Sequence, residues 1–243
     1  FIGNAPMDAS LFIQVSRSNS DKVKTIYDRA GAAINPDAPL LVANDGDVSA
    51  LAGAMGLGKG NLMGIAMGTS EAVGYVDKDQ NVLGWINELA FAPVDLQEGA
   101  MQDEWSTDFG VGCKYFSQDA VIKLAPYAGI EIPEDLSLAQ KLKFVQGLME
   151  NDDARAVAIF ETIGAYLAYT TVLYSQFYDL DYMMLLGRVM SGKGGDTIMS
   201  VCQKILAEEF PALNEKVEVI VPDEKTRRVG QSVAAASLPA SRK

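Results

Sequence analysis

The pair Asn44 and Asp45 is the strongest candidate for chemistry in this sequence. The pair follows an apolar run of strand length, residues 39–43, and precedes a small-residue helix expected over residues 47–55. Ligands of open α/β sheets bind at the carboxyl ends of strands, and a carboxylate placed there can accept a proton from an attacking hydroxyl, as the catalytic Asp of kinases does. Helix capping is the alternative interpretation, with Asn44, Asp45 or Asp47 as the N-cap.

Two glycine-containing segments could contact phosphate groups. Gly68, Thr69 and Ser70 lie between two strand-like runs. The glycine lets the backbone approach phosphate oxygens and the hydroxyls add donors, although an ordinary tight hairpin has the same pattern. The second segment, residues 187–195, follows an apolar strand and is expected to be a loop. Its G-K-G-G sequence is not a Walker motif, but free amides ahead of a helix suit a nucleotide.

A third candidate is Glu88, which stands among apolar neighbours in the segment W-I-N-E-L-A-F. Its carboxylate could bind sugar hydroxyls or face water at the end of a strand. The chain has no histidine and only two cysteines, Cys113 and Cys202. A Ser-His-Asp or Cys-His nucleophile system within the chain is therefore excluded, as are zinc sites built from several His or Cys ligands. Carboxylates, hydroxyls, backbone amides and bound magnesium remain as the means of chemistry.

The composition is that of a folded protein with an acidic surface. The chain has 243 residues, 49% of them hydrophobic, and this length and hydrophobic content are enough for a core in one or two domains. Its formal net charge is -12. The acidic surface repels nucleic acid and anionic membranes, so we expect neither as a partner. The distant cysteines indicate no disulfide framework, and the first residues lack the features of a signal peptide. We therefore expect a cytoplasmic protein.

The elements that must position these residues alternate between helices and strands. The sequence predicts helices over residues 21–33, 117–127, 137–149, 153–178, 196–209 and 228–238. It predicts strands over residues 62–67, 71–76, 182–186 and 217–221. This order favours an α/β layered structure.

Six segments, taken in order, resemble motifs of the ROK family (repressors, uncharacterised reading frames and kinases) of the hexokinase and actin-like ATPase superfamily. The segment VANDGDVSALAGA resembles the N-D-A-N-A-A-A-L motif, GIAMGTSEAVGYV resembles the second phosphate loop L-G-T-G-I-G-G-G, and INELAFAPVD resembles A-G-E-I-G-H followed by V-D. GCKYFSQDAV resembles G-C-L-E-x-Y-x-S-G-x-A-I, MMLLGRVMSG the adenosine-contacting strand and loop, and RRVGQSVAAASL the closing helix. Together these segments cover nearly the whole chain.

The resemblance implies an α/β fold of the actin-like ATPase (ribonuclease H-like) type, mainly its C-terminal domain with part of the N-terminal domain. It also implies in-line phosphoryl transfer from Mg-ATP to a sugar hydroxyl, with a homodimer as the expected assembly. The roles that it implies are catalytic base for Asp45, sugar contacts for Asn44 and Glu88, phosphate contacts for Gly68, Thr69 and Ser70, and an adenosine contact for Gly187. We expect domain boundaries at residues 1–52, 53–225 and 226–243.

The departures from the family pattern concern the sugar pocket and a zinc site. Phe91, Ser106 and Asp108 stand where the family has a histidine and two cysteines as zinc ligands, so that only Cys113 remains. We therefore expect no structural zinc, and we assign no side chain of this chain to a metal. Tyr115 replaces a glutamate of the sugar pocket, which makes glucose specificity doubtful.

Two further departures bear on nucleotide binding. Arg188 replaces a glycine of the adenosine loop, and no D-x-G-G-T phosphate hairpin precedes Asn44. We therefore expect this chain alone to be inactive or weak as a kinase. Two alternatives stay open: a non-catalytic sugar-sensing domain, as in the family's repressors, and a structural dimerisation module.

Overall fold

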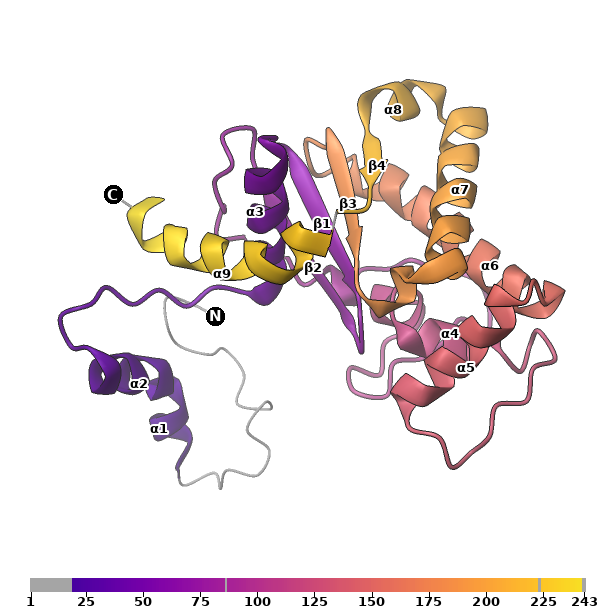
Figure 1. Ribbon diagram of the computed structural model, residues 1–243, viewed down its shortest axis with the longest axis horizontal. Coiled ribbons are helices and arrows are strands. Elements are labelled where there is room, and N and C mark those ends of the chain that lie inside the picture. The colour runs from indigo at the N-terminus through magenta and orange to yellow at the C-terminus, as the bar shows by residue number, and fades with distance from the viewer. Residues whose placement is uncertain (1–18, 86, 223, 242–243) are drawn as a thin grey trace.

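A four-stranded sheet forms the centre of the fold. The computed structural model describes residues 19–85, 87–222 and 224–241 (Figure 1), so the first 18 residues of the predicted N-terminal part lie outside it. The strands are β1 (Leu62–Met67), β2 (Glu71–Val76), β3 (Tyr182–Leu186) and β4 (Glu218–Ile220). Their order is β2-β1-β3-β4, with β2 antiparallel to β1 and the other pairs parallel.

One face of the sheet carries the larger core. Met63, Ile65 and Met67 of β1 point to this face, since alternate residues of a strand share a side. The covering helices are α4 (Gln118–Leu124), α5 (Leu138–Glu150), α6 (Ala154–Tyr174) and α7 (Gly192–Glu209). Figure 1 shows these helices together on one side of the sheet. A short helix, α8 (Pro211–Lys216), leads from α7 to the edge strand β4.

The opposite face is covered by α3 (Asp45–Leu57) and α9 (Glu224–Ser241). Leu62 and Met184 pack there against Ala50 of α3, with Ala234 and Leu238 of α9 in the same cluster. The molecule thus has an α/β/α layer order, which confirms the α/β structure expected from the alternating elements.

Helix α6 is the helix in the described part of the chain that is long and apolar enough to cross a membrane. Ten of its 21 residues are buried. Its neighbour is α7, and Gly164 brings the two helices close enough for a Cβ there to meet the backbone of Ile198. The core on the sheet therefore accounts for the apolar composition of α6.

The structure corrects the N-terminal part of the element prediction. No described strand pairs with residues 39–43, which connect helix α2 to α3 as extended chain. An apolar run forms a strand only where a sheet edge takes up its hydrogen bonds, and no described strand pairs with this run. The helix expected over residues 21–33 is two helices, α1 (Ser20–Lys24) and α2 (Ile26–Ile34).

Two helix starts also differ from the prediction. Helix α3 begins at Asp45, so the predicted boundary after residue 52 falls inside a continuous helix whose Ala50 and Ala54 are fully buried. The domain boundaries remain predictions. Helix α7 begins at Gly192, so the end of the loop expected over residues 187–195 is helical, and the rest contains the 3₁₀ turn η5 (Arg188–Met190).

Candidate active site

The first turn of α3 presents Asn44 and Asp45. Asn44 is the N-cap: its Oδ1 accepts the Gly46 N–H at 2.8 Å. This settles which residue caps the helix, since Asp47 lies within it. Asp45 is the first helical residue and its side chain is exposed. A carboxylate at a helix start gains from the partial positive charge of the unpaired N–H groups, so a cap at Asn44 and an exposed carboxylate at Asp45 are compatible.

Two glycines press this helix start against the edge strand β2. A Cβ at Gly46 would collide with the carbonyl of Val73, and a Cβ at Gly74 would collide with the carbonyl of Gly46. Backbone therefore lies directly on backbone, and only glycine fits at either position. The contact fixes where Asp45 sits relative to the start of β2.

A cavity of ≈ 390 Å³ opens beside this contact. Among the residues that line it are Asn44, Asp45, Gly68, Thr69, Ser70 and Glu88. Six of the seven residues singled out in the sequence thus face one cavity, although up to 44 positions separate them in the chain. Among the described residues, the lining contains no lysine or arginine, so the charge that they give it comes from carboxylates.

The turn between β1 and β2 supplies the hydroxyl groups of the cavity. The N–H of Gly68 donates to the carbonyl of Ser70 at 3.1 Å, and its carbonyl accepts the Gln118 N–H at 2.9 Å. Thr69 and Ser70 remain exposed at the tip. The turn is thus the tight hairpin connection that the sequence allowed, and it is also part of the cavity wall.

Gly187 does not line the cavity but supports it from behind. It follows β3, adopts φ 96° and lies so close to Met67 that a Cβ would collide with that residue's carbonyl. Met67 directly precedes Gly68, so Gly187 backs the phosphate-loop candidate across the sheet. Only glycine combines this φ with this approach.

One of the amides expected to be free for a nucleotide at the start of α7 is already bonded within the protein. The Lys193 N–H donates to Glu150 Oε1 at 2.9 Å, and Lys193 Nζ bonds the carboxylate of Asp152. Glu150 of α5 thus occupies the end of α7 at which an anion would bind. This contact joins the end of α5 to the start of α7.

A polar chain that the sequence did not reveal joins α3 to the loop that carries Glu88. Asn87 Nδ2 donates to Asp47 Oδ1 at 2.9 Å, and the Tyr178 hydroxyl donates to Asn87 Oδ1 at 3.0 Å. Burial raises the pKa of Asp47, and the hydrogen bond from Asn87 opposes that rise. Asn87 is 40 positions from Asp47 and 91 positions from Tyr178, so no local pattern could have linked them.

Glu71, the first residue of β2, is the second feature that sequence reasoning missed. Its side chain is buried, and neither carboxyl oxygen has a hydrogen-bond partner among the described residues. The backbone of Gly112 packs against the carboxyl group. Burial raises the pKa of Glu71 well above its usual range, so we infer that it is uncharged at neutral pH.

Replacing Glu71 with Gln should raise stability at pH 8 and leave it unchanged near pH 4. The unfolded carboxyl ionises near 4.5, so above that pH only the folded protein keeps the proton. Stability then falls by about 1.4 kcal/mol per pH unit up to the raised folded pKa, a loss that Gln cannot have. Melting temperatures at both pH values test this, with the exposed Glu134→Gln as control. An equal melting temperature at pH 8 would show that Glu71 is not held protonated.

The residues at the family's zinc positions do not fit a zinc ion. Phe91 packs on the ring of Trp105 with centroids 5.5 Å apart, and Ser106 Oγ accepts the Asp108 N–H at 3.2 Å. Burial raises the pKa of the Cys113 thiol to about 12, whereas a zinc ligand is a thiolate. No group of three or more acidic, Cys or His side chains is placed to hold a metal in the described part of the chain. The absence of zinc from the protein remains a prediction.

The architecture is similar to that of several solved proteins. No family model matches the sequence, and no curated protein matches it. A ROK family glucokinase from Streptomyces griseus, solved with glucose and AMPPNP, has a TM-score of 0.68 at 19% identity over 88% of this chain and 72% of its own. The ROK hexokinase from Thermus thermophilus has a TM-score of 0.68 at 17% identity over 89% and 69%.

A third similar structure is a regulator. The ROK family transcriptional regulator described as a homolog of the E. coli MLC protein has a TM-score of 0.69 at 17% identity, over 89% of this chain. The chain spans 56% of that regulator's length. The α/β/α layered sheet is thus shared with these ROK proteins. It is the fold of ROK proteins, and the predicted fold class is confirmed.

Proposed function

We propose that the protein phosphorylates a sugar hydroxyl with Mg-ATP, and that Asp45 is the catalytic base. The observation that supports this most is the shared cavity of Asn44, Asp45, Glu88 and the turn of residues 68–70. A sugar hydroxyl beside the exposed Asp45 carboxylate would lose its proton as it attacks the γ-phosphorus. Asn44 and Glu88 would orient the sugar by hydrogen bonds.

The nucleotide would approach from the side of the β1–β2 turn. Thr69 and Ser70 offer hydroxyl donors to its phosphates, and Gly187, behind the turn, would lie near the adenosine. With no lysine or arginine among the described residues that line the cavity, the phosphate charge would have to be balanced by the Mg²⁺ that accompanies ATP. This supports the expectation that the 243-residue chain alone is a weak kinase.

A sugar-sensing domain is the second candidate, because the fold is equally similar to a ROK transcriptional regulator. Tyr115, which replaces a glutamate of the family's sugar pocket, does not supply a polar group to the cavity in its place. The Tyr115 hydroxyl donates to Asp95 Oδ2 at 2.6 Å and accepts the Met101 N–H. It is bonded inside the loop and does not line the cavity. A sensor would bind sugar without transferring phosphate.

Incubation with Mg-ATP and a panel of hexoses and amino sugars tests the proposal. The 243-residue chain should bind one of these sugars by calorimetry and phosphorylate it slowly. Binding without phosphorylation would favour the sensor, and neither binding nor turnover would favour a structural dimerisation module. The homodimer, the cytoplasmic location and the absence of nucleic-acid and membrane partners remain expectations, of which light scattering tests the first.

A further inference from the structure

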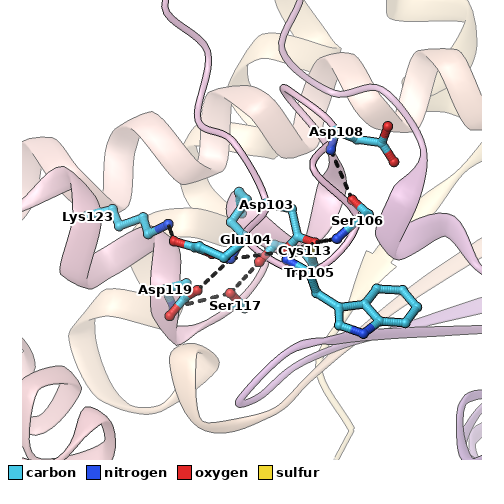
Figure 2. A network of polar contacts seen from close by, with 10 residues as sticks. Asp103, Glu104, Trp105, Ser106, Asp108, Cys113, Ser117, Asp119 and Lys123 are labelled. Atoms are coloured by element: carbon cyan, nitrogen blue, oxygen red, sulfur yellow. Dashed lines mark hydrogen bonds and ion pairs between the residues drawn. The ribbon is translucent and has the colours of Figure 1, made fainter. Parts of the chain in front are cut away.

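Lys114 is a buried lysine whose ammonium group is surrounded by carboxylates. It ends the 3₁₀ turn η4 (Gly112–Lys114), and its side chain is only 6% exposed. Its Nζ lies 3.1 Å from Asp103 Oδ1, 2.6 Å from Glu104 Oε2 and 2.9 Å from Asp119 Oδ2. An ammonium has three donors, and three carboxylates take them. Figure 2 shows these acidic side chains converging from the loop and from α4.

The carboxylates around Lys114 are themselves held in place. Asp103 Oδ2 accepts the N–H groups of Ser106 at 2.7 Å and Trp105 at 3.2 Å. Glu104 also pairs with Lys123 of α4, and hydrogen bonds from Lys114 and Lys123 lower its pKa to about 2. The cluster therefore joins the loop of residues 102–109, the turn η4 and the start of α4.

One aromatic contact links the same loop to the turn that follows Glu88, a residue of the cavity lining. Trp105 packs on Phe91, the last residue of the 3₁₀ turn η3 (Leu89–Phe91). The Phe91 N–H donates to the carbonyl of Glu88 at 3.1 Å, and the Gly112 N–H donates to the carbonyl of Ala92 at 3.0 Å. Glu88 thus directly precedes the turn η3. The last residue of that turn, Phe91, contacts the loop that Lys114 binds through Asp103 and Glu104.

We propose that Lys114 is a positioning residue: its ammonium, without a metal ion, pins the loop of residues 102–109 and thereby sets Glu88 at the cavity. The cluster lies where the residues at the family's zinc positions fail to form a metal site, with the Cys113 thiol donating to Asp103 at 3.6 Å. One fixed positive charge takes the place of a metal cross-link. The effect on sugar binding rests on the proposed function, whereas the cross-link itself does not.

Replacing Lys114 with Met should destabilise the protein, because the buried Asp103 carboxylate would lose its counter-charge. We expect the melting temperature to fall by about 4–8 °C, since Glu104 and Asp119 are partly exposed and stay hydrated. Lys123→Met is the matched control, because Lys123 is more exposed and pairs with Glu104; its melting temperature should change by about 2 °C or less. Lys114→Arg keeps the charge and should recover part of the loss.

Three further readouts separate a positioning role from general stability. At a temperature well below unfolding, Lys114→Met and Lys114→Arg should raise the KM for sugar about tenfold and leave the KM for ATP unchanged. Hydrogen exchange at the Phe91 and Gly112 amides should speed up in both variants. A chelator should leave the wild-type melting temperature unchanged, and purified protein should contain less than one zinc per chain.

The outcomes distinguish the two proposals. Stoichiometric zinc with chelator-sensitive stability would overturn the metal-free cross-link. Equal stability and exchange in Lys114→Met and Lys123→Met would overturn the role of Lys114. If no sugar is bound by any variant while the stability and exchange effects appear, the proposed function fails and the cross-link stands. If Lys114→Met does not fold, Lys114→Arg supplies the same comparisons.

Discussion

Replacing Asp45 with Asn is expected to lower kcat for sugar phosphorylation by roughly 10²- to 10⁴-fold, because Asn cannot accept the proton of the attacking hydroxyl. The substitution preserves the shape of the side chain and the N-cap bond of Asn44, which uses the Gly46 N–H. Sugar affinity should therefore change by only a few fold. The measurement is steady-state kinetics of the purified protein with Mg-ATP and the sugar.

Glu88→Gln is the matched variant for this experiment, since Glu88 lines the same cavity and is also exposed. As a sugar contact it should raise KM more than it lowers kcat. A loss of kcat in Glu88→Gln with normal turnover in Asp45→Asn would assign the base to Glu88. Equal turnover in Asp45→Asn and wild type would remove Asp45 from the chemistry.

The sequence could predict the site residues because each stands at the end of a local element. Asn44 and Asp45 precede a helix, and residues 68–70 connect two strands, so periodicity and turn residues locate them. Their meeting in one cavity follows from the pairing of β1 with β2 and from α3 crossing β2. That meeting was expected from family resemblance, and spacing in the chain alone could not have supplied it.

Other parts of the site depend on contacts that leave no local signal. Asp47 could be read only as a helix cap, yet its partner is Asn87. Glu71 begins a strand and alternates correctly, but whether a carboxyl is buried without a partner depends on Gly112 from another segment. Residues 39–43 show the reverse error: the pattern is that of a strand, but no described strand pairs with them. Strand formation needs a partner edge, which the run itself does not encode.

Lys114 illustrates the same limit for charged residues. Two of its partners, Asp103 and Glu104, lie about ten positions earlier and Asp119 lies five positions later. In the sequence these are scattered charges of an acidic chain, for which a solvated surface is the usual interpretation. The folded loop buries the lysine and turns them into a cluster. The consequence of a charge therefore depends on burial, which only the three-dimensional arrangement determines.

Gly74→Ala should cause a large loss of stability. Its Cβ would collide with the carbonyl of Gly46, a backbone atom that cannot rotate away as a side chain can. We expect a cost of about 3 kcal/mol or more, the upper end for overpacked sites, and a fall in melting temperature of about 6–12 °C. Thermal unfolding followed by circular dichroism measures it.

Gly147→Ala in α5 is the matched control, because a Cβ at Gly147 meets no atom within 4 Å. There the same change should stabilise the helix by about 0.5–1 kcal/mol. Gly74→Ala should also weaken sugar binding below its melting temperature, because the first turn of α3 must move away from β2 and carries Asn44 and Asp45 with it. If Gly74→Ala matched Gly147→Ala in stability and in sugar affinity, the close packing of α3 on β2 would not be what positions Asn44 and Asp45.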